Sequence, residues 1–325
     1  MGFFSKFLRK EADDIVAKSK QDIIDIEKID VKMSEFNISD LLEDIANIIS
    51  LKSNYEEITI LFETDKDIPS KIIGDRKLLG IVLLNLMENA IDFTEKGEVR
   101  LKIERRFTNL NEIHLRFKVI DTGIGIHPEA LKEILMPFFK GEIDTLAELD
   151  IEGSGLFNAR QILKKMKGKL SVSSEESKGS TFTADVSLFT TDPLNKRYYR
   201  LPEQASRRLK IKIFDVDQRS AEGLKKMFEY FRHDVSVPIL QNLHSLTDID
   251  DYDLIIIPDK FFNETMVAQM KEAKSKTNME LIIISERNAE MRDIAVQLAD
   301  GQIEKPFNQQ MIYELLVDLS AVNPA

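Results

Sequence analysis

The sequence has 325 residues, a length that suggests two domains at roughly 100–200 residues each. Its 45 Lys and Arg residues and 56 Asp and Glu residues give a net charge of −11, which disfavours a general nucleic-acid partner. Because no cysteine is present, disulfides, thiolate nucleophiles and cysteine-ligated metals are excluded. No apolar run approaches the roughly 20 residues of a membrane span and no secretory signal is evident, so we expect a cytoplasmic protein.

Residues 1–35 form the first predicted segment. Met1–Lys10 mixes phenylalanines with lysines and an arginine. This pattern is compatible with a peripheral membrane contact, and equally with a frayed start that packs on a partner helix. Residues 11–29 carry isoleucines along one side and contain no glycine or proline, which predicts a helix.

Residues 36–190 have the pattern of an α+β two-layer sandwich. One helix is expected to be capped by Asp40, and a second to run from Asp75 to Ile91, each with an apolar stripe. Alternating apolar and polar residues predict strands at 58–63, 99–103 and 113–119, and two more within 169–189. Long helices with a mostly antiparallel sheet define this fold class.

Residues 191–208 contain two prolines and five basic residues, and we interpret them as a linker. The pattern then changes, because Leu254–Ile257 and Leu281–Ile284 are continuous apolar runs of the kind found in parallel sheets covered on both faces. Helical segments alternate with these runs. Residues 209–325 are therefore predicted to form a smaller, doubly wound, flavodoxin-like α/β domain.

Polar residues interrupt the apolar pattern at three places in the first domain. Asn85 and Asn89 lie one turn apart on the predicted helix, which by itself indicates only an exposed face. A strand ends at the sequence Asp121-Thr-Gly-Ile-Gly-Ile, whose glycines permit a sharp turn or a close approach to a flat ligand. Gly153-Ser-Gly precedes a helical segment, where backbone N–H groups are able to bind phosphate.

The order of these motifs resembles that of the histidine kinase catalytic domain. Asn85-Leu-Met-Glu-Asn-Ala-Ile-Asp-Phe-Thr, Asp121-Thr-Gly-Ile-Gly-Ile, Met136-Pro-Phe-Phe and Gly153-Ser-Gly are similar to its N, G1, F and G2 boxes. Gly179-Ser-Thr-Phe resembles its closing strand, and Asp22–Met33 resembles the end of a dimerisation helix in hybrid sensor kinases. The resemblance spans roughly residues 20–190 and implies a GHKL-type ATP-binding fold.

The resemblance also implies roles for individual residues. Asn89 would bind Mg²⁺, Asn85 would contact phosphate or the metal shell, and Asp121 would accept a hydrogen bond from the adenine amine. Phe138 and Phe139 would anchor a lid at about 140–152. The implied cofactor-binding positions are Asn85, Asn89, Asp121, Gly123, Gly125, Phe138, Gly153, Gly155 and Thr181. ATP and Mg²⁺ are the implied cofactors.

Three features depart from the family pattern. No histidine precedes His114, and both His114 and His127 fit surface positions, so phosphorylation of a histidine within this chain is not expected. Asp92 stands where the family usually has a lysine, with Lys96 and Lys140 as candidates to compensate for its charge. The segment after Gly155 is about two residues shorter than the family pattern.

Glu88 is the second candidate catalytic residue, with Asn85, because a carboxylate is able to act as a general base. Two alternatives accompany it: Glu88 lies at the edge of its helix, or the chain is a stand-alone ATPase. The second is disfavoured because gyrase- and chaperone-type ATPases place a glutamate at the position of Asn85.

Residues 209–325 resemble a response-regulator receiver domain. Asp215 and Asp217 follow the first strand, Ser285 lies at a switch position, and Lys305 precedes a proline as in that family. The phosphoacceptor position falls on Pro258, and Asp259 comes one residue late, so that only a local bulge would restore it. We favour a pseudo-receiver that keeps the fold for docking.

These features lead to one functional hypothesis and one main alternative. The chain is predicted to be a histidine-kinase-like phosphorelay protein that binds MgATP and passes the γ-phosphoryl group to a histidine on a partner. It would form a homodimer through its N-terminal helix. The alternative is a catalytically degenerate nucleotide-binding scaffold with a pseudo-receiver that is not phosphorylated.

Overall fold

The computed structural model describes residues 30–50, 58–109, 111–132, 134, 154–192, 199, 201–240, 246–286 and 293–322. The chain divides into two compact units, residues 1–45 with 65–197 and residues 46–64 with 198–325. The N-terminal helix predicted for residues 11–29 lies outside the described residues. Residues 46–64, which were predicted to belong to the first domain, are grouped with the second unit.

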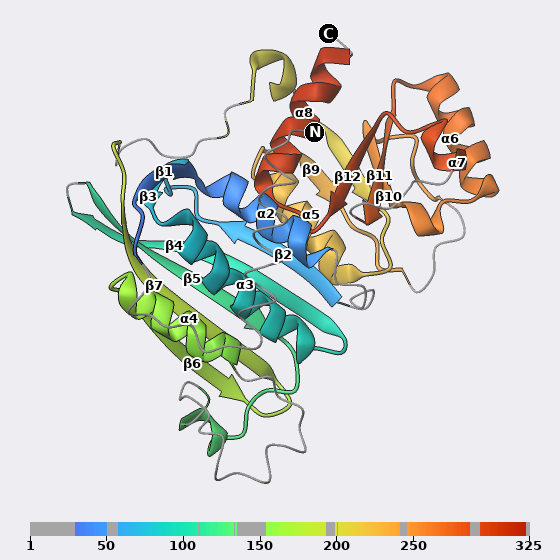
Figure 1. Cartoon of the computed structure of the whole chain (residues 1–325). Helices are drawn as coiled ribbons and strands as arrows, with labels where there is room; N and C mark the ends of the chain where they lie inside the picture. The colour runs from blue at the N-terminus through green and yellow to red at the C-terminus, as the bar shows by residue number, and fades with distance from the viewer. Residues whose placement is uncertain are drawn as a thin grey trace. The chain divides into compact units, whose positions relative to one another are not determined.

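Six strands of a seven-stranded sheet belong to the first unit, and the seventh, β2, lies in the segment grouped with the second unit (Figure 1). Its strand order is β1-β3-β7-β5-β4-β2, and β6 pairs with β7. The strands are β1 (Ser34–Asn37), β2 (Ile58–Thr64), β3 (Lys71–Gly74), β4 (Gly97–Asn109), β5 (Glu112–Asp121), β6 (Lys169–Glu175) and β7 (Gly179–Phe189). The registers β4–β5, β5–β7 and β6–β7 are antiparallel, as the sequence pattern predicts.

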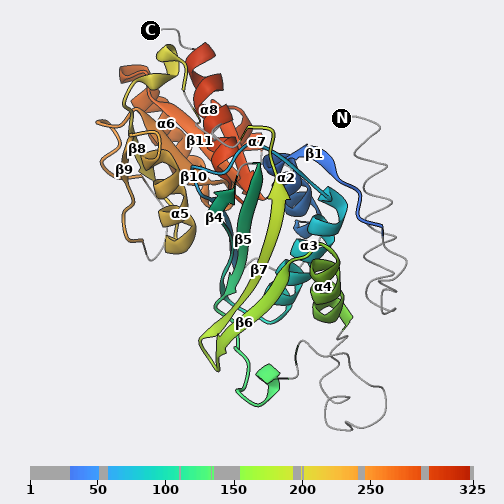
Figure 2. The ribbon, with the colours of Figure 1, turned by 90° about the vertical axis from the view of Figure 1, so that its left-hand side faces the viewer.

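Helices cover one face of this sheet (Figure 2). They are α2 (Ile38–Ile49), α3 (Arg76–Asp92) and α4 (Ser154–Lys165), and a short 3-10 helix, η2 (Ala130–Lys132), comes after β5. Side chains of β5 alternate between buried and half-buried along the whole strand, so that Leu115, Phe117 and Val119 face the helices. The two-layer α+β sandwich is therefore confirmed for the first unit.

The N-cap predicted for α3 is confirmed, and the one predicted for α2 is not. Asp75 caps α3, since its Oδ1 accepts a hydrogen bond from the Leu78 backbone N–H at 3.0 Å. The prediction that Asp40 caps α2 is wrong, because the helix begins at Ile38 and Asp40 lies in its first turn. Asn37 Oδ1 instead accepts from the Ser39 N–H at 2.9 Å.

The second unit contains a five-stranded parallel sheet with order β12-β11-β10-β8-β9. Its strands are β8 (Lys210–Ile213), β9 (Asp234–Ser236), β10 (Leu254–Pro258), β11 (Glu280–Glu286) and β12 (Gly301–Lys305). Its helices are η4 (Glu203–Ser206), α5 (Gln218–Glu229), η5 (Asp259–Phe261), α6 (Glu264–Lys276), α7 (Asp293–Val296) and α8 (Gln309–Val322). This order is that of a doubly wound flavodoxin-like sheet, as predicted.

Both faces of this sheet carry an apolar core. Side chains of α5 and α8 pack on one face around Ile213, Ile256 and Phe307, and those of α6 and α7 pack on the other around Ile255 and Ile283. Leu61, from the segment grouped with this unit, belongs to the first of these cores. β2 is a strand as predicted, but residues Ile58–Phe62 are buried on both of its faces.

Candidate functional site

Helix α3 presents one narrow polar stripe. Eleven of its 17 residues are buried, whereas Asn85 and Asn89 are half-buried one turn apart. The Asn85 Nδ2 atom is buried, and no hydrogen bond within the described part of the chain reaches it. A buried amide donor without a partner costs free energy, about 1–3 kcal/mol, so this stripe is suited to an acceptor supplied by a ligand.

The start of α4 faces this stripe. A Cβ atom placed on Gly155 would lie 3.5 Å from Asn85 Oδ1, so that the predicted phosphate-binding glycine and the predicted phosphate contact are neighbours. Gly153, Phe138, Phe139 and the lid at 140–152 were also assigned to the site. These positions lie outside the described residues and stay predictions.

Asp121 is a buried carboxylate at the end of β5. It is 5% exposed, and its Oδ1 accepts two backbone hydrogen bonds, from Gly123 N at 3.0 Å and from Ser180 N at 3.0 Å. Within the described residues, no hydrogen bond reaches its Oδ2. Burial raises the pKa of Asp121 above its usual value, and the two N–H groups oppose that rise. One acceptor oxygen thus remains for a donor from outside.

The loop after Asp121 is packed against neighbouring backbone at both of its glycines. A Cβ on Gly123 would lie 2.1 Å from the Phe93 carbonyl oxygen, and a Cβ on Gly125 would lie 2.1 Å from the Glu175 carbonyl oxygen. Gly125 also has a φ of +70°, which side chains disfavour. The glycines are therefore required by the protein's own backbone, in addition to any role toward a flat ligand.

The sheet register places Thr181 on the opposite face from Asp121. Thr181 pairs with Ile120 and is half-buried on the face that also carries Thr183 and Asp185, away from the helices. Ser180 lies on the same face as Asp121 and donates its N–H to that carboxylate. Because side chains alternate along a strand, a shift of one residue changes the face. Ser180 is thus the neighbour of Asp121, and the role of Thr181 stays a prediction.

Two further residues were weighed as parts of the site. Glu88 is buried at 6% exposure, rather than at an exposed edge of α3, and Asp92 is exposed at the end of that helix. Neither His114 nor His127 lies in the site. His114 stacks on Phe107 at 3.9 Å and its Nδ1 lies 2.8 Å from Ser187 Oγ, and the ring of His127 is exposed, as expected of surface histidines.

In the second unit, two of the predicted acidic residues come directly after β8. Asp215 is 1% exposed, and its Oδ1 accepts the Asp217 N–H at 2.9 Å. Burial raises the pKa of Asp215, against the opposing charge of Lys305. Asp217 caps α5 through Arg219 N at 3.1 Å, and its other carboxylate oxygen accepts the Thr59 hydroxyl.

The remaining receiver-like positions lie at the ends of the neighbouring strands. Pro258 is the last residue of β10, and Asp259 begins the 3-10 helix η5 instead of extending the strand. Ser285 Oγ accepts from Gln302 Nε2 at 2.8 Å, and Lys305 Nζ lies 3.9 Å from Glu286 Oε1. Among the residues that the structure describes, no three His, Asp or Glu side chains are grouped to hold a metal ion.

Comparison with known families assigns the first unit. Residues 74–190 match the family described as histidine kinase-, DNA gyrase B-, and HSP90-like ATPase. The matched segment begins just before α3 and ends just after β7, so it includes Asn85, Asn89, Asp121 and Gly155. Residues 74–190 are thus similar to the ATPase domains of histidine kinases, DNA gyrase B and HSP90. The predicted resemblance to this family is confirmed.

Individual relatives of the chain are named as signalling proteins. The chain is 32% identical to the hybrid signal transduction protein dokA of Dictyostelium discoideum over 57% of this chain and 12% of that protein. It is 25% identical to the autoinducer 2 sensor kinase/phosphatase LuxQ of Vibrio parahaemolyticus over 91% of this chain and 36% of that protein. The chain thus spans well under half the length of these relatives.

A solved structure resembles the chain over nearly its whole length. The crystal structure of full-length ShkA in complex with AMPPNP has a TM-score of 0.66, with 98% of this chain and 65% of that chain covered. The sequences are 19% identical, so this likeness is one of fold.

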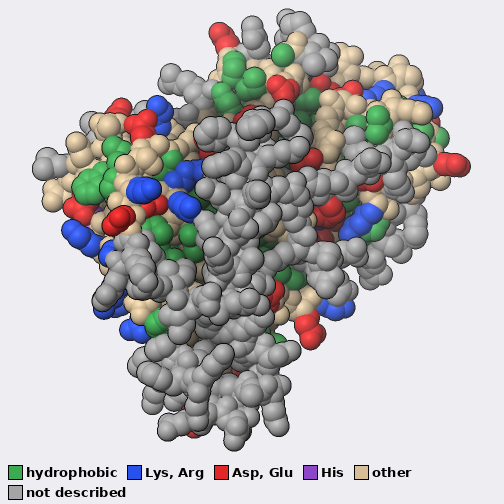
Figure 3. Space-filling model, viewed as in Figure 1, with side chains coloured by type: hydrophobic (Ala, Val, Ile, Leu, Met, Phe, Trp, Pro, Cys, Tyr) green, Lys and Arg blue, Asp and Glu red, His purple; other side chains and the backbone are tan. Residues whose placement is uncertain are grey.

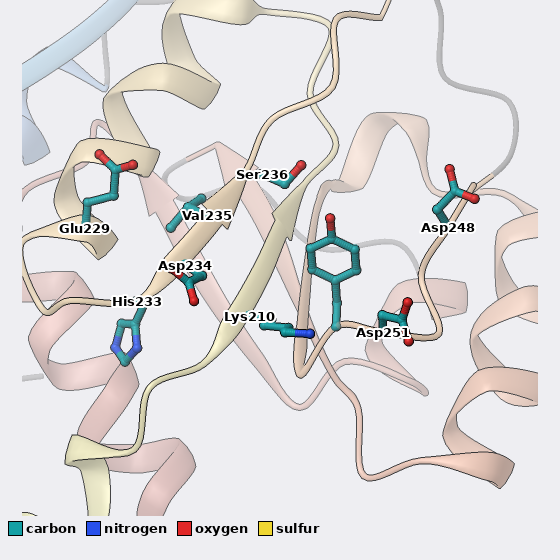
Figure 4. A pocket seen from close by; sticks show the side chains of 9 residues that line it. Lys210, Glu229, His233, Asp234, Val235, Ser236, Asp248 and Asp251 are labelled. Carbon is teal, nitrogen blue, oxygen red and sulfur yellow. The ribbon is translucent and has the colours of Figure 1, made fainter.

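A hollow of about 580 Å³ lies in the second unit. Lys210 and Asp234, the first residues of β8 and β9, line it with Asp248, Asp251 and Tyr252 (Figure 4). It therefore lies at the amino ends of the strands, whereas Asp215 and Asp259 lie just beyond the carboxyl ends. No predicted site residue contributes to it.

The described surface of the chain mixes charges of both signs. On the face seen in Figure 3, Lys and Arg side chains are interspersed with Asp and Glu side chains. Within the described residues, none of the helices combines the length and the apolar character that crossing a membrane requires.

Proposed function

We propose that the chain is the ATP-binding part of a two-component histidine kinase and that it holds MgATP between α3 and the loop after β5. One observation carries this proposal. Asp121 offers a single acceptor oxygen from a buried position, because its other oxygen is already bound by the Gly123 and Ser180 amides. A carboxylate in that state recognises an exocyclic amine, such as that of adenine.

The polar stripe of α3 would bind the triphosphate and its metal. Asn85 Nδ2, which lacks a partner in the described chain, would donate to a phosphate oxygen. The amide oxygen of Asn89 would serve as one oxygen ligand of Mg²⁺, which favours octahedral oxygen ligation shared with phosphates and water. When bound, the metal neutralises charge on the transferred phosphoryl group, and the residues named here orient it.

The phosphoryl acceptor is proposed to be a histidine of another chain. No histidine precedes His114, and His114 is occupied by Phe107, Ser187 and Glu112 on the sheet. Transfer to a histidine-containing partner, and dimerisation through residues 1–35, are both parts of this proposal.

The second unit is proposed to be a pseudo-receiver. Pro258 at the end of β10 has no group to phosphorylate, and Asp217 is engaged by α5 and Thr59. The same observation favours a second candidate function, a nucleotide-binding scaffold that does not transfer phosphate.

Calorimetric titration of the full chain with ADP, with and without Mg²⁺, tests the nucleotide site. The Asn89→Ala variant should lose most of the Mg²⁺-dependent affinity, and Asn47→Ala, which removes an exposed asparagine of α2, should behave as wild type. Equal Mg²⁺ dependence in both variants would contradict the metal assignment.

Radiolabelled ATP then separates the two candidate functions. Label that reaches a histidine of a histidine-containing partner supports the kinase. Tight binding without transfer to any such partner supports the scaffold.

A further inference from the structure

The hairpin that joins β6 to β7 is the element packed against the base-recognition loop. Its strands pair Ser174 with Ser180 and Glu175 with Gly179. The turn between them is closed by a hydrogen bond from Lys178 N to Glu175 O at 3.0 Å, with positive φ values at Ser177 and Gly179. The hairpin therefore has a defined backbone shape up to the residue that contacts Asp121.

Three hydrogen bonds connect this hairpin to residues 121–126. Ser180 N donates to Asp121 Oδ1 at 3.0 Å, and Ser177 N donates to the Ile124 carbonyl at 2.6 Å. The Ile126 N–H donates to Ser174 Oγ at 2.8 Å. The loop is thus held at its beginning, middle and end by one hairpin.

Direct backbone packing adds to these bonds. A Cβ on Gly179 would lie 2.0 Å from the Asp121 carbonyl oxygen, and a Cβ on Gly125 would lie 2.1 Å from that of Glu175. Hairpin and loop therefore touch without side chains between them, and a small displacement of the hairpin would displace the N–H that holds Asp121 Oδ1.

The side chain of Ser174 joins these parts. Its hydroxyl accepts from Ile126 N, lies 2.9 Å from the Gly179 carbonyl and lies 2.9 Å from the Ser180 hydroxyl. One hydroxyl has one proton and two lone pairs, so donation to Gly179 O and acceptance from Ile126 N and Ser180 Oγ use its full capacity. Ser174 has no part in the proposed binding of phosphate or of the metal.

We propose that Ser174 is a positioning residue for nucleobase recognition, because its hydroxyl fixes the β6–β7 hairpin against residues 121–126 so that only Asp121 Oδ2 faces the base. This inference rests on the proposed function. An ionised carboxylate with one fixed free oxygen accepts from a 6-amino purine and repels the carbonyl oxygen of a 6-keto purine. Without the Ser174 hydroxyl, Asp121 loses its fixed orientation, and the selectivity between the two bases declines.

The test compares variants of the full chain in their affinity for Mg·ADP and Mg·IDP, which differ at the 6-position of the base. Ser174→Ala should weaken ADP binding about tenfold and change IDP binding less than about twofold, since the variant loses the half-buried hydroxyl that holds the loop carrying Asp121. Ser174→Thr, which keeps the hydroxyl, should restore the preference for ADP. Ser173→Ala is the matched control, because this neighbouring side chain is exposed.

Three results would overturn the inference: an unchanged ADP preference in Ser174→Ala, an equal loss for ADP and IDP, or the same effect in Ser173→Ala. An equal loss would indicate a purely structural role. Thermal unfolding of each variant, recorded alongside, identifies a variant that fails to fold, and in that case Ser174→Cys takes the place of Ser174→Ala.

Amide hydrogen exchange without nucleotide separates this inference from the proposed function. In Ser174→Ala, the Gly123 and Ile126 amides should exchange at least about tenfold faster, while Phe117 in the middle of β5 stays unchanged. Unaltered exchange at Gly123 and Ile126 overturns the hairpin contact alone. A wild-type chain that binds neither nucleotide overturns the proposed function and the base selectivity together, whatever the exchange rates show.

Discussion

Asp121 in the first unit and Asp215 in the second are the same local structure in two settings. Each lies at the carboxyl end of a sheet strand, and each accepts, through Oδ1, the N–H of the residue two positions on, at 3.0 Å and 2.9 Å. Burial raises the pKa of both. The two differ in the next segment of the chain, because Asp121 leads into a glycine loop whereas Asp215 leads into a helix capped by Asp217.

This comparison shows that an aspartate at a strand end does not by itself define a site. In the first unit, no hydrogen bond within the described residues reaches Asp121 Oδ2 or Asn85 Nδ2, and both are available to the proposed ligand. Beside Asp215, the Asp217 carboxylate accepts hydrogen bonds from the first turn of α5 and from the Thr59 hydroxyl. The neighbouring strand β10 ends in Pro258. The first arrangement favours binding, and the second favours a structural role.

The largest expected effect comes from exchanging the carboxylates for amides. Asp121→Asn should weaken ADP binding by about 100-fold. The Gly123 and Ser180 N–H groups would hold the amide oxygen, so that the amide NH₂ group, a donor, would face the donor amine of the base. Asp215→Asn, the matched change in the second unit, should leave ADP affinity within about twofold of wild type. Calorimetric titration measures the ADP affinity of both variants. Equal losses of affinity would show that Asp121 and Asp215 do not differ in their role toward the nucleotide.

Alanine at the loop glycine should be the next most damaging change. Gly125→Ala meets the Glu175 backbone and a φ of +70°, so we expect a loss of about 2–3 kcal/mol in unfolding free energy. Gly155→Ala finds ordinary contact distances at Asn85, and its cost should stay below about 1 kcal/mol. Denaturant unfolding of the two variants gives the comparison, and similar losses would count against the described loop packing.

A smaller effect is expected inside the second unit. Thr59→Val keeps the shape of the side chain and removes the hydroxyl that donates to Asp217. The second unit should lose about 1 kcal/mol of stability, the usual value of one such bond, with no change in ADP affinity. Thermal unfolding measures this loss, and Thr183→Val, on the half-buried face of β7, is the control.

The pH response should be the smallest effect and should have opposite consequences in the two units. Asp121 binds an amine only when ionised, so ADP affinity should fall as acidification reaches its raised pKa, above the 3.8 of an ordinary aspartate. For Asp215, the raised pKa means that the folded state binds the proton more tightly than the unfolded state. Its contribution to stability therefore increases as the pH falls through the folded pKa towards 3.8.

Two measurements check these pH responses. Calorimetric titration with ADP at several pH values monitors Asp121, and a flat profile in the wild type would contradict its assignment. Thermal unfolding over the same range monitors Asp215, and the Asp215→Asn variant should lack its part of the slope. An identical slope in this variant would show that other groups cause the dependence.

Local patterns predicted most of the fold. Period-two alternation identified β4, β5 and β7, and Asp75 was predicted as the start of α3, because these signals lie within a few neighbouring residues. The flavodoxin-like order of the second unit was inferred from its continuous apolar runs. Such patterns of apolar and polar residues reflect directly which side chains are buried.

Non-local contacts account for the features that the sequence did not predict. Ser180, rather than Thr181, contacts Asp121, and this depends on the register between β5 and β7. Ser174 carries no motif, since serines in β6 look alike until its pairing with Ser180 is known. The burial of β2 on both faces required knowledge of the Leu61 environment, because its neighbours in the core come from residues 211–319.

The burial of α3 restricts how its site can change. Because packing surrounds this helix on nearly every side, substitutions at most of its positions would disturb the interior before they reached a ligand. Variation in ligand preference is thus confined to the few positions of the stripe that contains Asn85 and Asn89. An engineer who wishes to redesign the proposed phosphate-binding stripe would randomise those positions together and leave the rest of the helix untouched.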